Sequence, residues 1–291
     1  MASKISEGAH PLPIVFGYEE EWRAFGTRHG EFLSRFPNIE KAIDLAFQRT
    51  LYTDDLVDRT LYFLGRIATE EFMEILLLCA NGYGIGAKKL VRGMYERAVT
   101  ARYLDKNPNE VDNYLAFHKI THHKLLKAVR STMGTEVFSD AETQKIERDF
   151  EEVKERFMVT DCKTCKTRRL NFTWSKVDFV SMAKIAGPLG QLIVPGYYLP
   201  TTEAHSAIGA IFSRLDTEAA DKGDLIFDGA AQRGHADNAF ITAHNILLDL
   251  IDLQKERFHL EALDTVLQTC LADFMVIWKD YTPHAVTTST G

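Results

Sequence analysis

The fold class is decided by residues 55–104, which read DLVDRTLYFLGRIATEEFMEILLLCA (55–80), NGYGIGA (81–87) and KKLVRGMYERAVTARYL (88–104). Apolar residues recur at helical spacing from Leu56 to Cys79, a run long enough for one helix to cross a whole domain. The preceding Thr-Asp-Asp segment, 53–55, supplies side chains that can cap the start of this helix. A glycine-rich turn then separates it from a second helix over 87–104. Two long helices joined by a short turn predict a helical fold.

The rest of the chain shows the same helical periodicity, interrupted by short loops. Further helices are expected over 19–36, 39–49, 108–132, 139–157, 179–186, 201–215, 235–258 and 261–279. We expect Pro37 and Asn38 to separate the first two of these. No segment alternates for long with the period of two that a half-buried strand shows. The sequence therefore predicts an all-α protein, a multi-helix bundle of about eight to ten helices with little or no β-structure.

The length of 291 residues lies between the usual sizes of one domain and two. We expect an N-terminal helical arm over 1–54, a single helical domain over 55–280 and a flexible tail over 281–291. Within that domain, a charged helix and a basic loop with a CxxC motif form an insertion at about 139–176. The core bundle is then expected to comprise roughly 55–132 and 196–280.

Composition places the chain among ordinary globular proteins, with 45% hydrophobic residues, 26% charged residues and a formal net charge of -7. Its longest apolar runs are too short to span a bilayer, so no membrane partner is expected. The N-terminal MASKISEGAHPLP lacks the apolar stretch of a secretory signal. These features predict a protein of the cytoplasm, in a bacterium-like cell.

A local surplus of Lys, Arg and His over residues 81–130 stands against the acidic background. Arg92 and Glu96 are four residues apart and share a helix face, either as a surface ion pair or as a buried pair that orients the guanidinium toward a phosphate. Lys88 and Lys89 follow the glycine-rich turn at a helix start, which suits an anion. The preferred interpretation of that turn is different: its glycines let two helices cross closely.

Three histidines are candidates for chemistry. His118 and His122 are four residues apart and align with apolar positions of their helix, so we expect both to be buried and His123 to be solvated. A helical His pair can also bind a metal, but Lys119 directly after His118 excludes the HExxH zinc motif. His205 is expected in the first turn of a helix, near Tyr198, where it could serve as a neutral base or as a packing residue.

The connector 160–176 offers a different chemistry. Cys162 and Cys165 supply two zinc ligands and need two more, from nearby side chains or a second subunit. Arg168 and Arg169, with Trp174 alongside, would suit nucleic-acid phosphates and base stacking. A basic loop in an acidic protein also occurs without any such partner.

The run from Asn81 to Thr100 resembles the bacterial domain-of-unknown-function family 5677. Three elements carry the resemblance: Arg92-x-x-x-Glu96, the pair Trp174-Ser175, and Tyr198 followed by Thr201-x-x-x-His205. It covers roughly residues 55–255, and Thr201 stands where many relatives show Ser. The resemblance implies an all-helical fold and no established activity. The family is loosely similar to helical nucleases of the HEPN type, but their Arg-His motif has no match in a late helix of this chain.

Three functional hypotheses remain open. The first is a defence-type binding protein whose buried centre of Arg92, Glu96, His118 and His205 contacts RNA or a phosphorylated small molecule. The second is a non-enzymatic helical interaction module in which those residues fix helix register. The third is a metal-independent ribonuclease-like enzyme, with a histidine as acid or base and Arg92 as phosphate clamp. Zinc at the CxxC motif is the one cofactor suggested, and a homodimer is expected from base rates.

Overall fold

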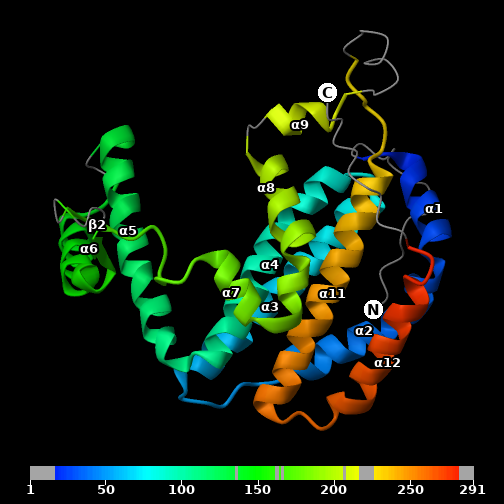
Figure 1. Ribbon diagram of the computed structural model, residues 1–291, viewed down its shortest axis with the longest axis horizontal. Coiled ribbons are helices and arrows are strands. Elements are labelled where there is room, and N and C mark those ends of the chain that lie inside the picture. Colours follow the sequence, from blue (N-terminus) through cyan, green and yellow to red (C-terminus); the bar gives the residue numbers. More distant parts are fainter. Residues whose placement is uncertain are drawn as a thin grey trace, which may run out of the picture. The chain divides into compact units, whose positions relative to one another are not determined.

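The structure is a computed structural model and describes residues 17–134, 137–160, 164, 167–205, 208–215 and 226–281 (Figure 1). Its longer helices are α1 (Glu19–Arg28), α2 (Gly30–Phe47), α3 (Leu56–Ala80), α4 (Gly84–Lys106), α5 (Val111–Met133), α6 (Asp140–Val153), α7 (Phe179–Ile185), α11 (Arg233–Phe258) and α12 (Leu263–Ile277). Short helical segments are η1 (Pro108–Glu110), η2 (Lys154–Phe157), η3 (Gly187–Leu192), the π-helical η4 (Val194–Tyr198), α8 (Leu199–Ala204) and α9 (Ile208–Phe212). The protein is all-α, as the sequence predicts.

The one small sheet of the described residues is a hairpin of β1 (Met158–Thr160) and β2 (Arg168–Leu170). The two strands are antiparallel, with Met158 opposite Leu170. This hairpin lies within the segment that the sequence treats as an insertion.

The chain divides into two compact units. The first unit comprises Met1–Tyr52, Tyr62–Val99 and Gln191–Gly291, and the second comprises Thr53–Leu61 and Thr100–Gly190. The single domain with an insertion that the sequence suggests stays a prediction. No helix within the described part of the chain is both long and apolar enough to cross a membrane.

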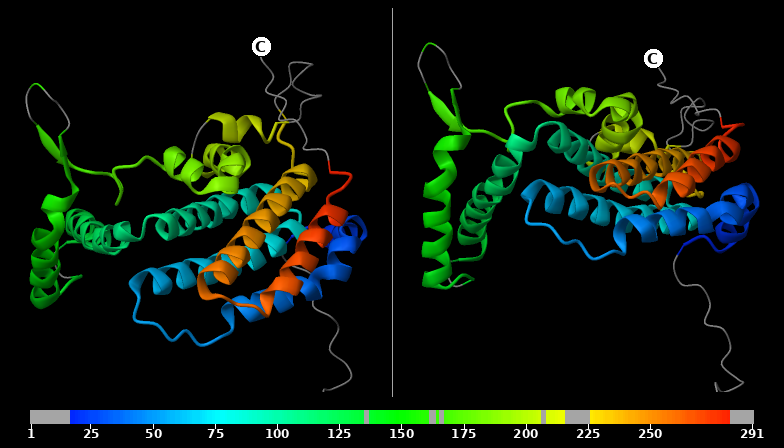
Figure 2. Two further views of the ribbon diagram at one scale, coloured as in Figure 1. Left: turned by 60° about the horizontal axis from the view of Figure 1, so that its bottom comes forward. Right: turned by 90° about the horizontal axis from the view of Figure 1, so that it is seen from below.

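In the first unit, α2, α11 and α12 pack against one another (Figures 1 and 2). Their contact is aromatic: Phe32, Phe240 and Trp278 surround the fully buried His244. The apolar face of α4 is buried throughout, which gives the polar residues of the same helix a fixed orientation. Cys79 and Cys270 are buried as free thiols, as their apolar surroundings in the sequence indicate.

The predicted helix boundary at Pro37 is wrong. We expected Pro37 to end a helix, but Pro37 lies inside α2, and the break between the first two helices falls at His29. Phe32 and Ile39, on either side of the proline, are both buried. The packing of this continuous apolar face outweighs the hydrogen bond that a proline removes.

Gly84 allows α4 to begin against the start of α11. A Cβ at Gly84 would lie 2.3 Å from the backbone nitrogen of Ala236 and 2.4 Å from the carbonyl oxygen of Gln232. The Gln232 side chain also accepts a hydrogen bond from the backbone N–H of Ile85 at 3.0 Å. The glycine-rich turn therefore permits close helix packing here, which is the preferred interpretation of its sequence.

In the second unit, α5 and α6 lie side by side (Figures 1 and 2). The expected start of α6 is confirmed: the Ser139 hydroxyl accepts from the Glu142 N–H, and the Glu142 carboxylate accepts from the Ser139 N–H. A small core of Ile120, Val153 and Phe157 joins these helices to η2.

Candidate functional site

Polar residues four apart on α4 form one stripe, which we define as Lys88, Arg92 and Glu96. Arg92 Nε donates to Glu96 Oε1 at 3.0 Å, and Arg92 Nη1 lies 3.2 Å from His205 Nε2. The guanidinium also lies over the ring of Tyr197, 5.0 Å from its centroid. The Arg92 side chain keeps 24% of its surface exposed. It is held on three sides while part of it still faces solvent.

The contact between Arg92 and His205 fixes the tautomer of the imidazole. A guanidinium has only donors, so His205 Nε2 must accept and the proton of the neutral ring resides on Nδ1. His205 is exposed, so that Nδ1–H group is accessible to a ligand. This pair would offer an anion two adjacent donors, the guanidinium and the imidazole N–H.

The position of His205 differs from the prediction. We expected it in the first turn of a helix, but it follows α8 as its C-cap, with an extended backbone. Pro200 stands at the start of α8, so the helix begins earlier than the sequence suggests. The argument for a neutral base at the positive end of a helix therefore fails, and the tautomer follows from Arg92 instead.

Lys88 occupies the buried end of the stripe. Its Nζ lies 2.5 Å from His235 Nδ1, in a position to donate to it. Burial lowers the pKa of Lys88, and the Glu203 carboxylate opposes that shift. Burial and the neighbouring charges of Lys88 and Arg214 lower the pKa of His235 to about 4. His235 is therefore a neutral acceptor at physiological pH.

A second carboxylate near the stripe is kept partly protonated. Glu71 of α3 pairs with Arg97 at 2.7 Å, and its side chain is only 14% exposed. Burial raises its pKa to about 7, against the opposing effect of Arg97, and the carboxylates of Glu74 and Glu96 raise it further. Near neutral pH the region of Arg92 therefore carries less negative charge than its composition suggests.

Three residues that the sequence did not single out complete this centre: Tyr197, Glu203 and His235. Tyr198, which the sequence singled out, is half exposed, and its neighbour Tyr197 contacts Arg92. Lys89 is exposed on α4, one residue from the buried Lys88. Only the helical phase decides which residue of an adjacent pair faces the centre. For Tyr197 and Tyr198, the π-helical turn of η4 means that this phase cannot be predicted from the sequence.

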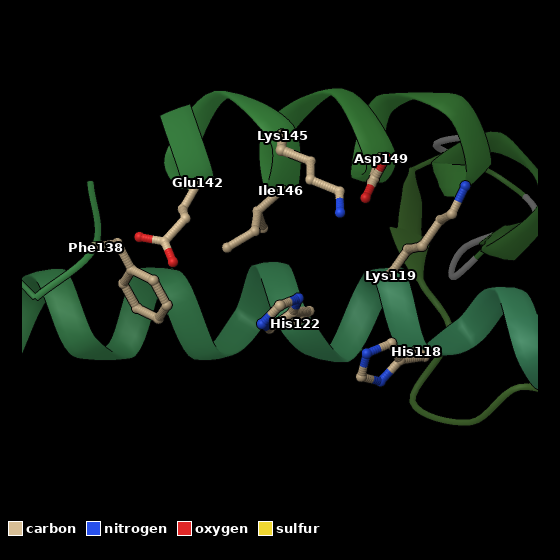
Figure 3. Close-up of a pocket in the computed structure, with 8 residues that line it drawn as sticks. All are labelled: His118, Lys119, His122, Phe138, Glu142, Lys145, Ile146 and Asp149. Carbon is tan, nitrogen blue, oxygen red and sulfur yellow. The ribbon is translucent and has the colours of Figure 1, made fainter. Parts of the chain in front are cut away.

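His118 and His122 belong to the second unit, where they line a cavity of about 430 Å³ between α5 and α6 (Figure 3). Their rings stack at a centroid distance of 5.3 Å. The other lining residues are Lys119, Phe138, Glu142, Lys145, Ile146 and Asp149. The two lysines and two carboxylates of this lining balance, so it does not by itself favour an anion.

The predicted buried face of α5 is wrong. His123 is the buried histidine, stacked on Phe150 with ring centroids 3.7 Å apart, and burial is the main cause of its lowered pKa. His118 is exposed, and so are Leu115 and Leu125, two of the apolar positions with which the histidines align. The inner face instead follows Ile120, because α6 packs against that side of the helix.

The basic connector is engaged within the second unit. Arg168 pairs with Glu155 at 3.0 Å, and Arg169 lies over the ring of Phe172. Trp174 packs edge-on against two tyrosines, at centroid distances of 5.8 Å from Tyr103 and 5.3 Å from Tyr114. Trp174 therefore serves packing in this structure.

Cys162 and Cys165 lie outside the described residues, and zinc at the CxxC motif stays a prediction. Among the residues that are described, no cluster of three or more His, Cys, Asp or Glu side chains is arranged to hold a metal ion.

Comparison with known proteins identifies one family. A family model, described as a family of unknown function (DUF5677), matches residues 60–223, more than half of the 291 residues. No curated protein and no solved structure gives a significant match. The match includes Arg92, Glu96 and His205, on which the resemblance seen in the sequence rests. The chain is therefore a member of the DUF5677 family.

Proposed function

We propose that this protein binds the phosphate group of RNA or of a phosphorylated small molecule through Arg92 and His205 in the first unit. The observation that supports the proposal is the state of the Arg92 guanidinium. Glu96, His205 and Tyr197 position it, and no hydrogen bond of the described residues uses Nη2. A guanidinium fixed in this way can offer its remaining donors to a phosphate with little loss of side-chain entropy.

The surroundings of Arg92 strengthen such an interaction. Lys88 lies one helical turn away and is buried, so its charge is weakly screened. The partly protonated Glu71 leaves Arg97 incompletely neutralised. Both effects favour an anion beside Arg92.

The binding test uses a fluorescent single-stranded RNA oligonucleotide, with inorganic pyrophosphate as competitor, followed by fluorescence anisotropy. Arg92→Ala should weaken RNA binding about tenfold or more, because a charge-assisted contact is lost. Arg23→Ala is the matched control, because Arg23 is an exposed arginine elsewhere in the first unit. Equal RNA affinity of the Arg92→Ala variant and the parent chain would overturn the proposal. A parent chain that binds neither the RNA nor pyrophosphate would overturn it as well.

The alternative of a purely structural polar network predicts a different result. If Arg92 serves ligand binding, Arg92→Ala should change the free energy of unfolding by less than about 1 kcal/mol, because Arg92 and Glu96 form a partly exposed ion pair. A loss of stability well above that, with unchanged RNA affinity, would favour the structural network.

Metal-independent phosphodiester cleavage is a second candidate, favoured by one feature. The Arg92 guanidinium contacts Glu96 through Nε and His205 through Nη1. A phosphate bound to this guanidinium would therefore lie between a base, Glu96, and an acid, His205. Glu96 would take the proton of the attacking 2′-hydroxyl. A phosphate that displaced Arg92 from His205 Nε2 would free that nitrogen to carry a proton, which His205 would then give to the leaving 5′-oxygen. RNA fragments formed in the presence of EDTA by the parent chain, and not formed by His205→Ala at RNA concentrations that saturate the variant, would support it. Intact RNA would contradict it.

A further inference from the structure

The outward face of α3 in the first unit carries a stripe of exposed apolar side chains. Their exposed fractions are 57% for Phe63, 43% for Ile67, 44% for Met73 and 55% for Leu77. These positions lie within an arc of about 120° of the helix, opposite the buried face that includes Phe72 and Ile75. Large apolar side chains gathered on one helix face mark a contact surface.

Charges divide this stripe into two halves. Arg66 lies in the N-terminal half, beside Ile67, Glu70 lies at the midpoint, and Glu74 lies in the C-terminal half. Within one chain, Arg66 Nε lies 3.7 Å from Glu70 Oε1, whereas no described residue forms an ion pair with Glu74. A cation at one end and an unpaired anion at the other complement a second stripe that runs in the opposite direction.

We propose that two copies of this chain associate through antiparallel α3 helices, with a twofold axis beside Glu70. This register places Phe63 against Leu77 of the second copy and Ile67 against Met73 of the second copy. The same register places Arg66 against Glu74 of the second copy. Each of the four apolar side chains then has an apolar partner, and each unlike charge pair occurs twice.

Twofold symmetry explains why a second copy of the chain fits the apolar stripe of α3. An interface of this kind uses the same patch on both chains, so the patch must be complementary to itself when reversed. The stripe meets this condition in its apolar residues and in its charges. The one like-charge contact is between the two Glu70 side chains at the axis, and Arg66 of the same chain lies beside each of them.

Charge reversal tests the association, with sedimentation velocity over a wide range of protein concentration as the measurement. Arg66→Glu and Glu74→Arg should each weaken the dimer roughly tenfold or more, because two attractive pairs become repulsive. An equimolar mixture of the two single variants should restore the dimer, since both cross pairs in the mixed species are attractive. The double variant Arg66→Glu/Glu74→Arg should also recover it.

Arg23→Glu is the matched control, because it makes the same change of charge at an exposed arginine on α1. Circular dichroism melting of each variant checks that the helices remain folded. A parent chain that is monomeric throughout would overturn the proposal. Two single variants that dimerise like the parent, or that fail to complement each other in the mixture, would overturn it as well.

Discussion

His244 shows how far its surroundings change the chemistry of a single residue. The ring is fully buried, and its Nδ1 accepts the indole N–H of Trp278 at 3.1 Å. The proton of the neutral ring is therefore on Nε2, which has no hydrogen-bond partner among the described residues. Burial lowers the pKa of His244 to about 3.

The pKa of His244 predicts a contribution to acid sensitivity. Because the folded value lies below the ordinary 6.5, the neutral ring stabilises the fold above that pH, and the stability is lost as pH falls toward 3. His244→Phe should reduce the loss of unfolding free energy over this range, measured by urea denaturation at a series of pH values. His118→Phe, at an exposed position, is the control. Parallel pH profiles for the parent and His244→Phe would contradict the prediction.

At the scale of elements, the start of α4 depends on which glycine lies against α11. Gly84 faces the backbone of α11, whereas a Cβ at Gly86 would meet its nearest neighbour, Leu78 Cδ1, at 3.7 Å. Both are glycines of the same turn, two residues apart. Only Gly84 is required for the packing of α4 against α11.

These two glycines form a matched pair for mutation. Gly84→Ala should destabilise the protein by about 1–3 kcal/mol or more, because the added methyl group overlaps the backbone of α11. Gly86→Ala should be neutral or stabilising by up to about 1 kcal/mol, because alanine is the better helix former. Urea denaturation monitored by circular dichroism measures both. Similar unfolding free energies for the two variants would show that the close approach is not a constraint.

At the scale of the whole molecule, the charge balance limits how RNA could bind. The chain has a formal net charge of -7, so a long nucleic acid is repelled except where cations gather. The proposed site around Arg92 can contact only a few phosphates.

This limit predicts a weak dependence of RNA affinity on salt. With one to three phosphates neutralised on a single strand, the logarithm of the binding constant should fall against the logarithm of salt concentration with a slope of about -0.7 to -2. Arg92→Ala should make the slope shallower by about 0.7. Fluorescence anisotropy at increasing KCl concentration gives both slopes. A slope steeper than about -4 would indicate an extended basic surface elsewhere.

How much of the candidate site could be predicted depends on sequence distance. Arg92 and Glu96 are four residues apart on one helix, so their contact follows from helical geometry. The contacts of Arg92 with His205 and of Lys88 with His235 join residues more than a hundred positions apart. The helix around His205 also ends earlier than its sequence indicates. No local sequence pattern predicts these long-range contacts.

The all-α class, the extent of α3 and the start of α6 follow from the sequence alone, because helical periodicity and capping act between residues a few positions apart. It could not place the buried face of α5, the continuity of α2 through Pro37 or the partners of Arg92. Those were decided by tertiary structure, since burial depends on which helix packs against which side. That same burial sets the pKa values of Glu71, His235 and His244.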